Sequence, residues 1–160
     1  MRYFIIILLI FIGLSTSAFQ KVQQTLSQPS DERAAQNKLP ISKDNMWAVL
    51  GKTKVSLDEK EYTYSAKYSP EVKALNGTQM TIKGFMLPLE TTEKFKHFIL
   101  SKRTPTCPYC PPGEPNEIIE VFSTKPVKWS ENIITVTGKF SLINNQNFGM
   151  FFKLDNAVVN

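Results

Sequence analysis

The chain has 160 residues, a length that favours one domain, and its hydrophobic fraction of 42% and charged fraction of 21% are those of an ordinary globular protein. Its 19 basic and 14 acidic side chains give a formal net charge of +5, and the lysines are scattered along the chain. Nucleic-acid binding needs a concentrated basic face, which this pattern lacks, so we expect no nucleic-acid partner.

Residues 1–18 have the pattern of a secretory signal. Arg2 gives a positive start, an apolar run follows, and small residues at Thr16 and Ala18 suit a signal peptidase. The run is shorter than the about 20 apolar residues that a spanning helix needs. We therefore predict a cleaved signal peptide and a periplasmic or secreted protein. The alternative is an uncleaved inner-membrane anchor of residues 3–19, the one case in which we expect a membrane partner.

The polar residues 19–43 lack apolar periodicity and are predicted to be a flexible linker, followed by a folded domain of residues 44–160. That domain opens with a short predicted helix over residues 45–50. Trp47 and Leu50 lie three residues apart on this helix and share one face. We expect this face to pack on the core.

The remainder of the domain alternates between apolar and polar residues, which is the pattern of half-buried strands. The expected strands, in chain order, are residues 62–68, 80–88, 93–100, 117–123, 134–142 and 148–154, with one helical turn over residues 70–75. Residues 93–100 also fit a helix face, but the surrounding strands favour a strand. Asn144 and Asn145 are predicted to turn the last two strands into a hairpin.

About five strands with little helix between them indicate a small antiparallel barrel. The predicted fold class is therefore mainly β, an OB-like barrel with one short N-terminal helix, and an open sandwich is the alternative. Gly84 and Gly138 stand inside predicted strands. Single glycines of this kind suit the bends or bulges that the corners of a barrel need.

Both cysteines lie in the cysteine loop (residues 107–116), which reads Cys-Pro-Tyr-Cys-Pro-Pro-Gly-Glu-Pro-Asn. Three interpretations are open. Cys107 and Cys110 have the CxxC spacing of thiol–disulfide oxidoreductases, although the prolines that follow prevent the helix that usually activates such a thiol. A Zn or Cu ion held by Cys107, Cys110 and His97 is the second interpretation. A structural disulfide, or two free thiols, is the third.

Two motifs resemble those of a family of bacterial envelope proteins described only as a domain of unknown function. Residues 84–90, Gly-Phe-Met-Leu-Pro-Leu-Glu, match the glycine–aromatic strand end of that family. The loop residues in register with its proline-rich loop are Cys107, Pro111, Pro112, Pro115 and Asn116. The loop histidine of the family is Tyr109 here, so no role of that histidine transfers. The resemblance covers roughly residues 46–157 and implies the fold and the compartment, but no activity.

We therefore expect an exported accessory module of the bacterial envelope that is not an enzyme and carries no cofactor. Functional residues concentrate on loops held by a rigid frame, so we expect the cysteine loop to bind an envelope protein, a metal or a small ligand. The residues expected to make this contact are Pro111, Pro112, Glu114, Pro115 and Asn116. Glu114 and Glu117 are expected to be solvated. The alternatives are a periplasmic thiol–disulfide oxidoreductase and a Zn- or Cu-binding envelope protein.

Overall fold

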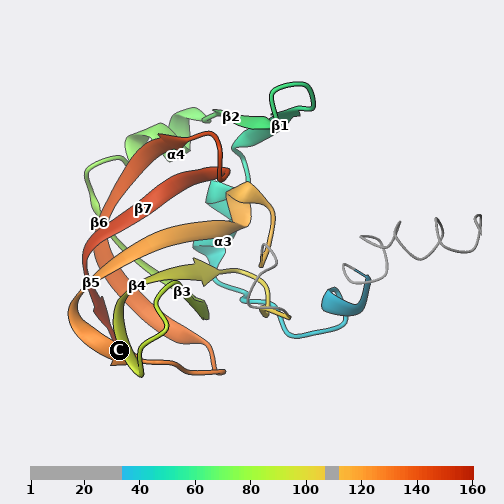
Figure 1. Cartoon of the computed structure of the whole chain (residues 1–160). Coiled ribbons are helices and arrows are strands. Elements are labelled where there is room, and N and C mark those ends of the chain that lie inside the picture. Colours follow the sequence, from blue (N-terminus) through green and yellow to red (C-terminus); the bar gives the residue numbers. More distant parts are fainter. Residues whose placement is uncertain (1–33, 107–111) are drawn as a thin grey trace, which may run out of the picture. The chain divides into compact units, whose positions relative to one another are not determined.

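The computed structural model describes residues 34–106 and 112–160 (Figure 1). The chain divides into two compact units, Met1–Lys38 and Leu39–Asn160. In the described part of the first unit, residues 34–36 form a single helical turn. Nowhere in the described ranges does a helix have the length and apolar character needed to cross a membrane.

The second unit contains a closed barrel of five strands in the order β3-β4-β5-β7-β6 (Figure 1). The strands are β3 (Gln79–Pro88), β4 (Lys94–Ser101), β5 (Ile118–Lys128), β6 (Ile134–Asn145) and β7 (Met150–Val159). Neighbouring strands are antiparallel except β5 and β7, which run parallel. The predicted mainly β, OB-like barrel is confirmed. It was predicted to be antiparallel, and it is mixed because β5 and β7 pair in parallel. The strand predicted over residues 93–100 is β4, and the predicted hairpin joins β6 to β7. Its turn lies at residues 146–149, so the prediction that Asn144 and Asn145 form the turn is wrong, because both residues still belong to β6.

Short elements lie outside the barrel wall. They are α3 (Asn45–Leu50), β1 (Lys54–Asp58), β2 (Thr63–Lys67), α4 (Pro70–Ala74) and the 3-10 helix η1 (Pro115–Glu117). The strand expected over residues 62–68 is present as β2, but it pairs with β1 in a separate two-stranded sheet. Sequence reasoning missed β1, although Val55 and Leu57 alternate with polar residues; four of its five residues are exposed.

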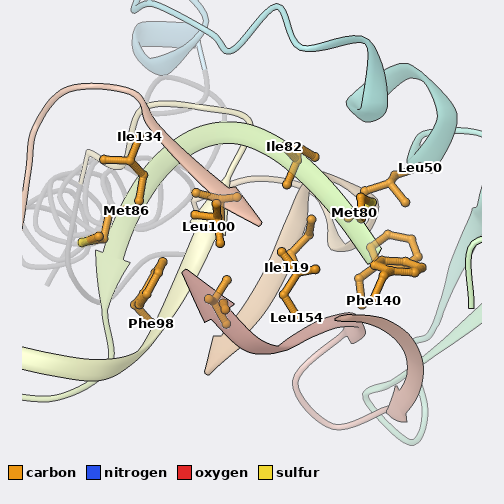
Figure 2. Packing of buried hydrophobic residues seen from close by; sticks show 14 of the residues in the cluster. Leu50, Met80, Ile82, Met86, Phe98, Leu100, Ile119, Ile134, Phe140 and Leu154 are labelled. Carbon is orange, nitrogen blue, oxygen red and sulfur yellow. The ribbon is translucent and has the colours of Figure 1, made fainter. Parts of the chain in front are cut away.

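Side chains from all five strands fill the barrel. The inward residues that are fully buried include Ile82, Leu100, Ile119, Phe140 and Leu154, one from each strand (Figure 2). Burial of a side chain of this size stabilises the fold by about 1.5–3 kcal/mol. The core is therefore the main source of stability and the rigid frame on which the surface loops are held.

Helix α3 packs on one end of this core. Asp44 caps its N-terminus with its side chain, and Leu50 lies beside Met80 in the core (Figure 2). Trp47 is buried, and its indole Nε1 donates a hydrogen bond of 2.7 Å to the carbonyl oxygen of Lys83 on β3. The prediction that Trp47 and Leu50 face the core is confirmed.

Gly84 stands where β3 changes its partner strand. Residues 79–84 pair with β6, whereas residues 85–88 pair with β4. A Cβ atom on Gly84 would lie 2.7 Å from the carbonyl oxygen of Ser101. Gly138 lies at the register shift between β6 and β7. The expectation that these two glycines mark irregular points of the barrel is confirmed.

We expect Gly84→Ala to lower the free energy of unfolding by about 1–3 kcal/mol, because the new methyl group must displace backbone. Lys83→Ala is the control, since the Lys83 side chain is exposed and such changes alter stability by less than about 0.5 kcal/mol. Urea denaturation measures both variants. Equal midpoints for Gly84→Ala and the wild type would contradict the close approach of β3 and β4.

Candidate functional site

The candidate site is built on the connection between β4 and β5, residues 102–117, which contains the cysteine loop. Glu117 joins the two ends of this connection. The Lys102 ammonium donates to Glu117 Oε1 at 3.0 Å, and the Arg103 guanidinium donates to both carboxylate oxygens. The backbone N–H of Lys102 also donates to the Glu117 carbonyl oxygen at 3.0 Å. We call Glu117, Lys102 and Arg103 the loop clamp, because they close the connection at its base.

Glu117 is only 8% exposed, so the expectation that it is solvated is wrong. Burial raises the pKa of Glu117, but hydrogen bonds from Arg103 and Lys102 outweigh burial and hold the pKa below its ordinary value. The carboxylate is therefore charged at neutral pH and paired with both cations. A bidentate arginine–carboxylate contact is strong and directional, so the clamp fixes the two ends of the connection relative to each other.

Pro112 and Gly113 are the first described residues of the cysteine loop, and both are buried next to β4. The Ser101 hydroxyl donates to the Pro112 carbonyl oxygen at 3.2 Å, and the backbone N–H of Arg103 donates to the same hydroxyl at 3.1 Å. A Cβ atom on Gly113 would lie 3.1 Å from Glu117 Cβ. This contact is tight, so a larger residue at position 113 would require Glu117 to shift by a few tenths of an ångström.

The end of the loop is held by further hydrogen bonds. The Glu117 backbone N–H donates to the Glu114 carbonyl oxygen at 2.7 Å. Asn116 donates from its amide to the Thr53 carbonyl oxygen at 3.0 Å. Pro115 lies against Gly149 in the turn between β6 and β7. Several residues predicted to bind a partner therefore serve, at least in part, to hold the loop on the barrel.

A pocket of about 300 Å³ is lined in part by residues 104–106, which directly follow the clamp residue Arg103 in the sequence. Its described lining comes from the end of β3 (residues 85–88), from residues 104–106 and from residues 129–131 between β5 and β6. Phe85 and Trp129 contribute aromatic rings, and the apolar walls are completed by Met86, Leu87, Pro88 and Pro105. Thr106 lines the pocket and is bonded directly to Cys107. The pocket therefore adjoins the start of the cysteine loop.

The predicted redox pair and metal site depend on residues whose placement is not described. Cys107, Cys110 and Pro111 lie outside the described residues, so both interpretations stay predictions. Within residues 34–106 and 112–160, no group of three or more His, Cys, Asp or Glu side chains is arranged to hold a metal ion.

His97, the third proposed metal ligand, lies on β4 and contacts β5. Its Nε2 atom lies 2.9 Å from Glu120 Oε1, and its ring stacks on Phe122 with 4.3 Å between the ring centroids. Ser101, at the base of the cysteine loop, is four residues further along β4, which corresponds to about 13 Å. The described side-chain contacts of His97 are thus with β5, away from the clamp.

Sequence reasoning missed the pocket because its three lining segments are far apart in the chain. Pairing of β3 with β4 brings the first two together, and the connection from β5 to β6 supplies the third. One signal was present in the sequence. Residues 84–90 form a distinctive motif, and its middle residues 85–88 line the pocket.

Comparison with known proteins identifies the family. A family model described as "Protein of unknown function (DUF3299)" matches residues 19–150, which is most of the chain. The chain belongs to the DUF3299 family. This confirms the resemblance drawn from residues 84–90 and the cysteine loop, and no curated protein matches this DUF3299 chain.

A crystal structure of a DUF3299 family protein from Pseudomonas aeruginosa PAO1 is similar to this DUF3299 chain. The two share 25% sequence identity with a TM-score of 0.50, and the match covers 60% of this chain and 66% of that one. This chain thus spans about two thirds of the length of that protein. The likeness supports the fold.

We expect Glu117→Gln to lower the free energy of unfolding by about 1–3 kcal/mol at neutral pH, because Lys102 and Arg103 lose their counter-charge. The pKa of Glu117 is lowered in the folded state. The stability difference between wild type and variant is therefore complete above about pH 4.3, the ordinary glutamate pKa, and shrinks as the pH falls below it.

Glu93→Gln is the matched control, because Glu93 pairs with Lys128 at 3.0 Å on the exposed surface. Such a pair contributes about 0–1 kcal/mol. Denaturant unfolding between neutral pH and about pH 3 measures the three proteins. A difference between wild type and Glu117→Gln that stays constant over this range would contradict the lowered pKa.

Proposed function

We propose that this DUF3299 protein is an exported, non-catalytic binding module of the bacterial envelope. Its pocket takes a small apolar ligand or an apolar group of an envelope protein, and the pocket lining includes Thr106, the residue before the cysteine loop. The observation that carries the proposal is the pocket. Ligand sites measure about 300–1,000 Å³ and have mostly apolar walls with a few polar groups. The pocket here, about 300 Å³ with apolar walls and a rim of Thr, Ser and Glu residues, fits the lower end of that range.

The pocket is held by regular structure. Phe85, Met86 and Leu87 lie in the paired part of β3, opposite Ser101, Leu100 and Ile99 of β4. On the other wall, the Thr104 hydroxyl donates to the Pro40 carbonyl oxygen at 2.7 Å, and the preceding residue belongs to the loop clamp. A site formed before the ligand arrives loses less conformational entropy on binding, which favours affinity.

Trp129 supplies the surface that a ligand would cover. It is 57% exposed, although it lines an apolar pocket. Tryptophan offers a large contact area and is enriched at the energetic centres of binding interfaces. A ligand in the pocket would cover part of this ring and remove it from water. Burial of apolar surface in this way favours binding.

Export is supported by the order of segments along the chain. The apolar start and the small residues at Thr16 and Ala18 suit a signal, and the family match begins at residue 19. We propose a periplasmic or secreted location, with the inner-membrane anchor of residues 3–19 as the alternative. In either case the partner is a component of the envelope.

The alternative functions are those of a thiol–disulfide oxidoreductase and of a Zn- or Cu-binding protein. Both depend on Cys107 and Cys110, which lie outside the described residues. The proposed binding function depends instead on residues 85–88, 104–106 and 129–131, all of which are described. It can therefore be tested independently of the state of the cysteines.

Neutral 2-phenylethanol is the probe for the pocket, and ligand-observed NMR measures its binding. We expect saturable binding to the wild-type protein that weakens about threefold to tenfold in Trp129→Ala, since an aromatic contact is lost. Phe148→Ala is the control, because Phe148 is an aromatic residue that is 74% exposed outside the pocket. It should bind like the wild type. No saturable binding, or equal binding by Trp129→Ala and the wild type, would refute the proposal.

A further inference from the structure

We infer that the ligand of this pocket is a small amphipathic cation, an ammonium group joined to an apolar body. The apolar body would fill the pocket, and the ammonium would lie at its rim between the Glu131 carboxylate and the Trp129 ring. This inference rests on the proposed function, because it uses the same pocket and adds the chemical class of the ligand.

The first observation is the charge of the lining. Glu131 is the one charged side chain among the described residues that line the pocket. The remaining polar lining residues, Thr104, Thr106 and Ser130, are neutral. The protein as a whole has a net charge of +5, whereas the described lining of the pocket carries one negative charge and no positive charge.

The second observation is that Glu131 has no partner. Among residues 34–106 and 112–160, its side chain makes no ion pair and no hydrogen bond. Two cations that adjoin the lining segments in the sequence are already engaged. Arg103, which precedes the lining segment 104–106, pairs with Glu117, and Lys128 pairs with Glu93. Lys43 and Lys83 line a neighbouring pocket with Ile133, but neither forms an ion pair with Glu131.

Several other carboxylates of the described residues have partners, although those of Glu59 and Glu61 make no ion pair either. Glu71 pairs with Lys52, Glu120 with His97 and Asp155 with Lys153. Glu90 accepts hydrogen bonds from the backbone N–H groups of Lys96 and His97. These groups have structural partners within the protein, whereas Glu131 has none among the described residues and, unlike Glu59 and Glu61, lines the apolar pocket.

The third observation is that two aromatic residues line the same pocket as this carboxylate. Trp129 lies two residues before Glu131 in the sequence, and Phe85 belongs to β3, which supplies another part of the lining. The faces of aromatic rings attract cations, tryptophan most strongly. A carboxylate and an indole in the lining of one apolar pocket together favour an ammonium over a neutral group. They disfavour a carboxylate ligand, which would face Glu131 without a compensating cation.

The test compares three ligands of the same shape: 2-phenylethylammonium, neutral 2-phenylethanol and anionic phenylacetate. We expect the ammonium to bind about threefold to tenfold more tightly than the alcohol, and phenylacetate to bind most weakly. Raising the salt concentration should reduce the preference for the ammonium, because the rim is open to solvent.

Glu131→Gln should bring the affinity of the ammonium down to that of the alcohol and leave the alcohol unaffected. Glu93→Gln is the control, because it removes a carboxylate outside the pocket and should keep the preference. Equal binding of ammonium and alcohol to the wild type would overturn the cation inference and leave the pocket proposal intact. Binding of none of the three ligands would refute both.

Discussion

The carboxylate of Glu117, held between Lys102 and Arg103, is the interaction on which the candidate site depends. It joins the last residue before β5 to the first residues after β4, so the long connection between them begins and ends at one point. A buried charge that lost its partners would cost several kcal/mol, about 3–5 in measured cases, so this arrangement strongly disfavours other loop conformations. The clamp therefore sets where residues 104–106 leave the barrel, and with them one wall of the pocket.

The motif of residues 84–90 links this clamp to the barrel. Its glycine permits the close approach to Ser101, and its next residues form the pocket lining. Its final residue, Glu90, accepts hydrogen bonds of 3.1 and 2.8 Å from the backbone N–H groups of Lys96 and His97, which fixes the turn from β3 to β4. One short segment thus closes the barrel, shapes the pocket and orients the strand that carries the clamp cations.

The fold could be predicted because apolar alternation is a local signal. The inward side chains of residues 134–142 repeat every second residue and identify β6 without knowledge of its neighbours. Glu117 could not be placed in this way, since its burial depends on two cations at the end of another strand. Trp129 and Glu131 were overlooked for the same reason: each resembles an ordinary loop residue until β3 is brought beside them. Local periodicity therefore gives the barrel, whereas the site arises from contacts between distant segments.

The central claim is that ligands bind at the end of β3, and mapping of backbone amide shifts by NMR tests it most directly. The labelled mature protein would be titrated with a set of small apolar compounds, without any substitution. The account predicts that the largest shifts fall on residues 85–87, 104, 106 and 129–131. Shifts concentrated instead on residues 143–147, where a shallow polar pocket lies between β6 and β7, or shifts spread evenly over the surface, would contradict it.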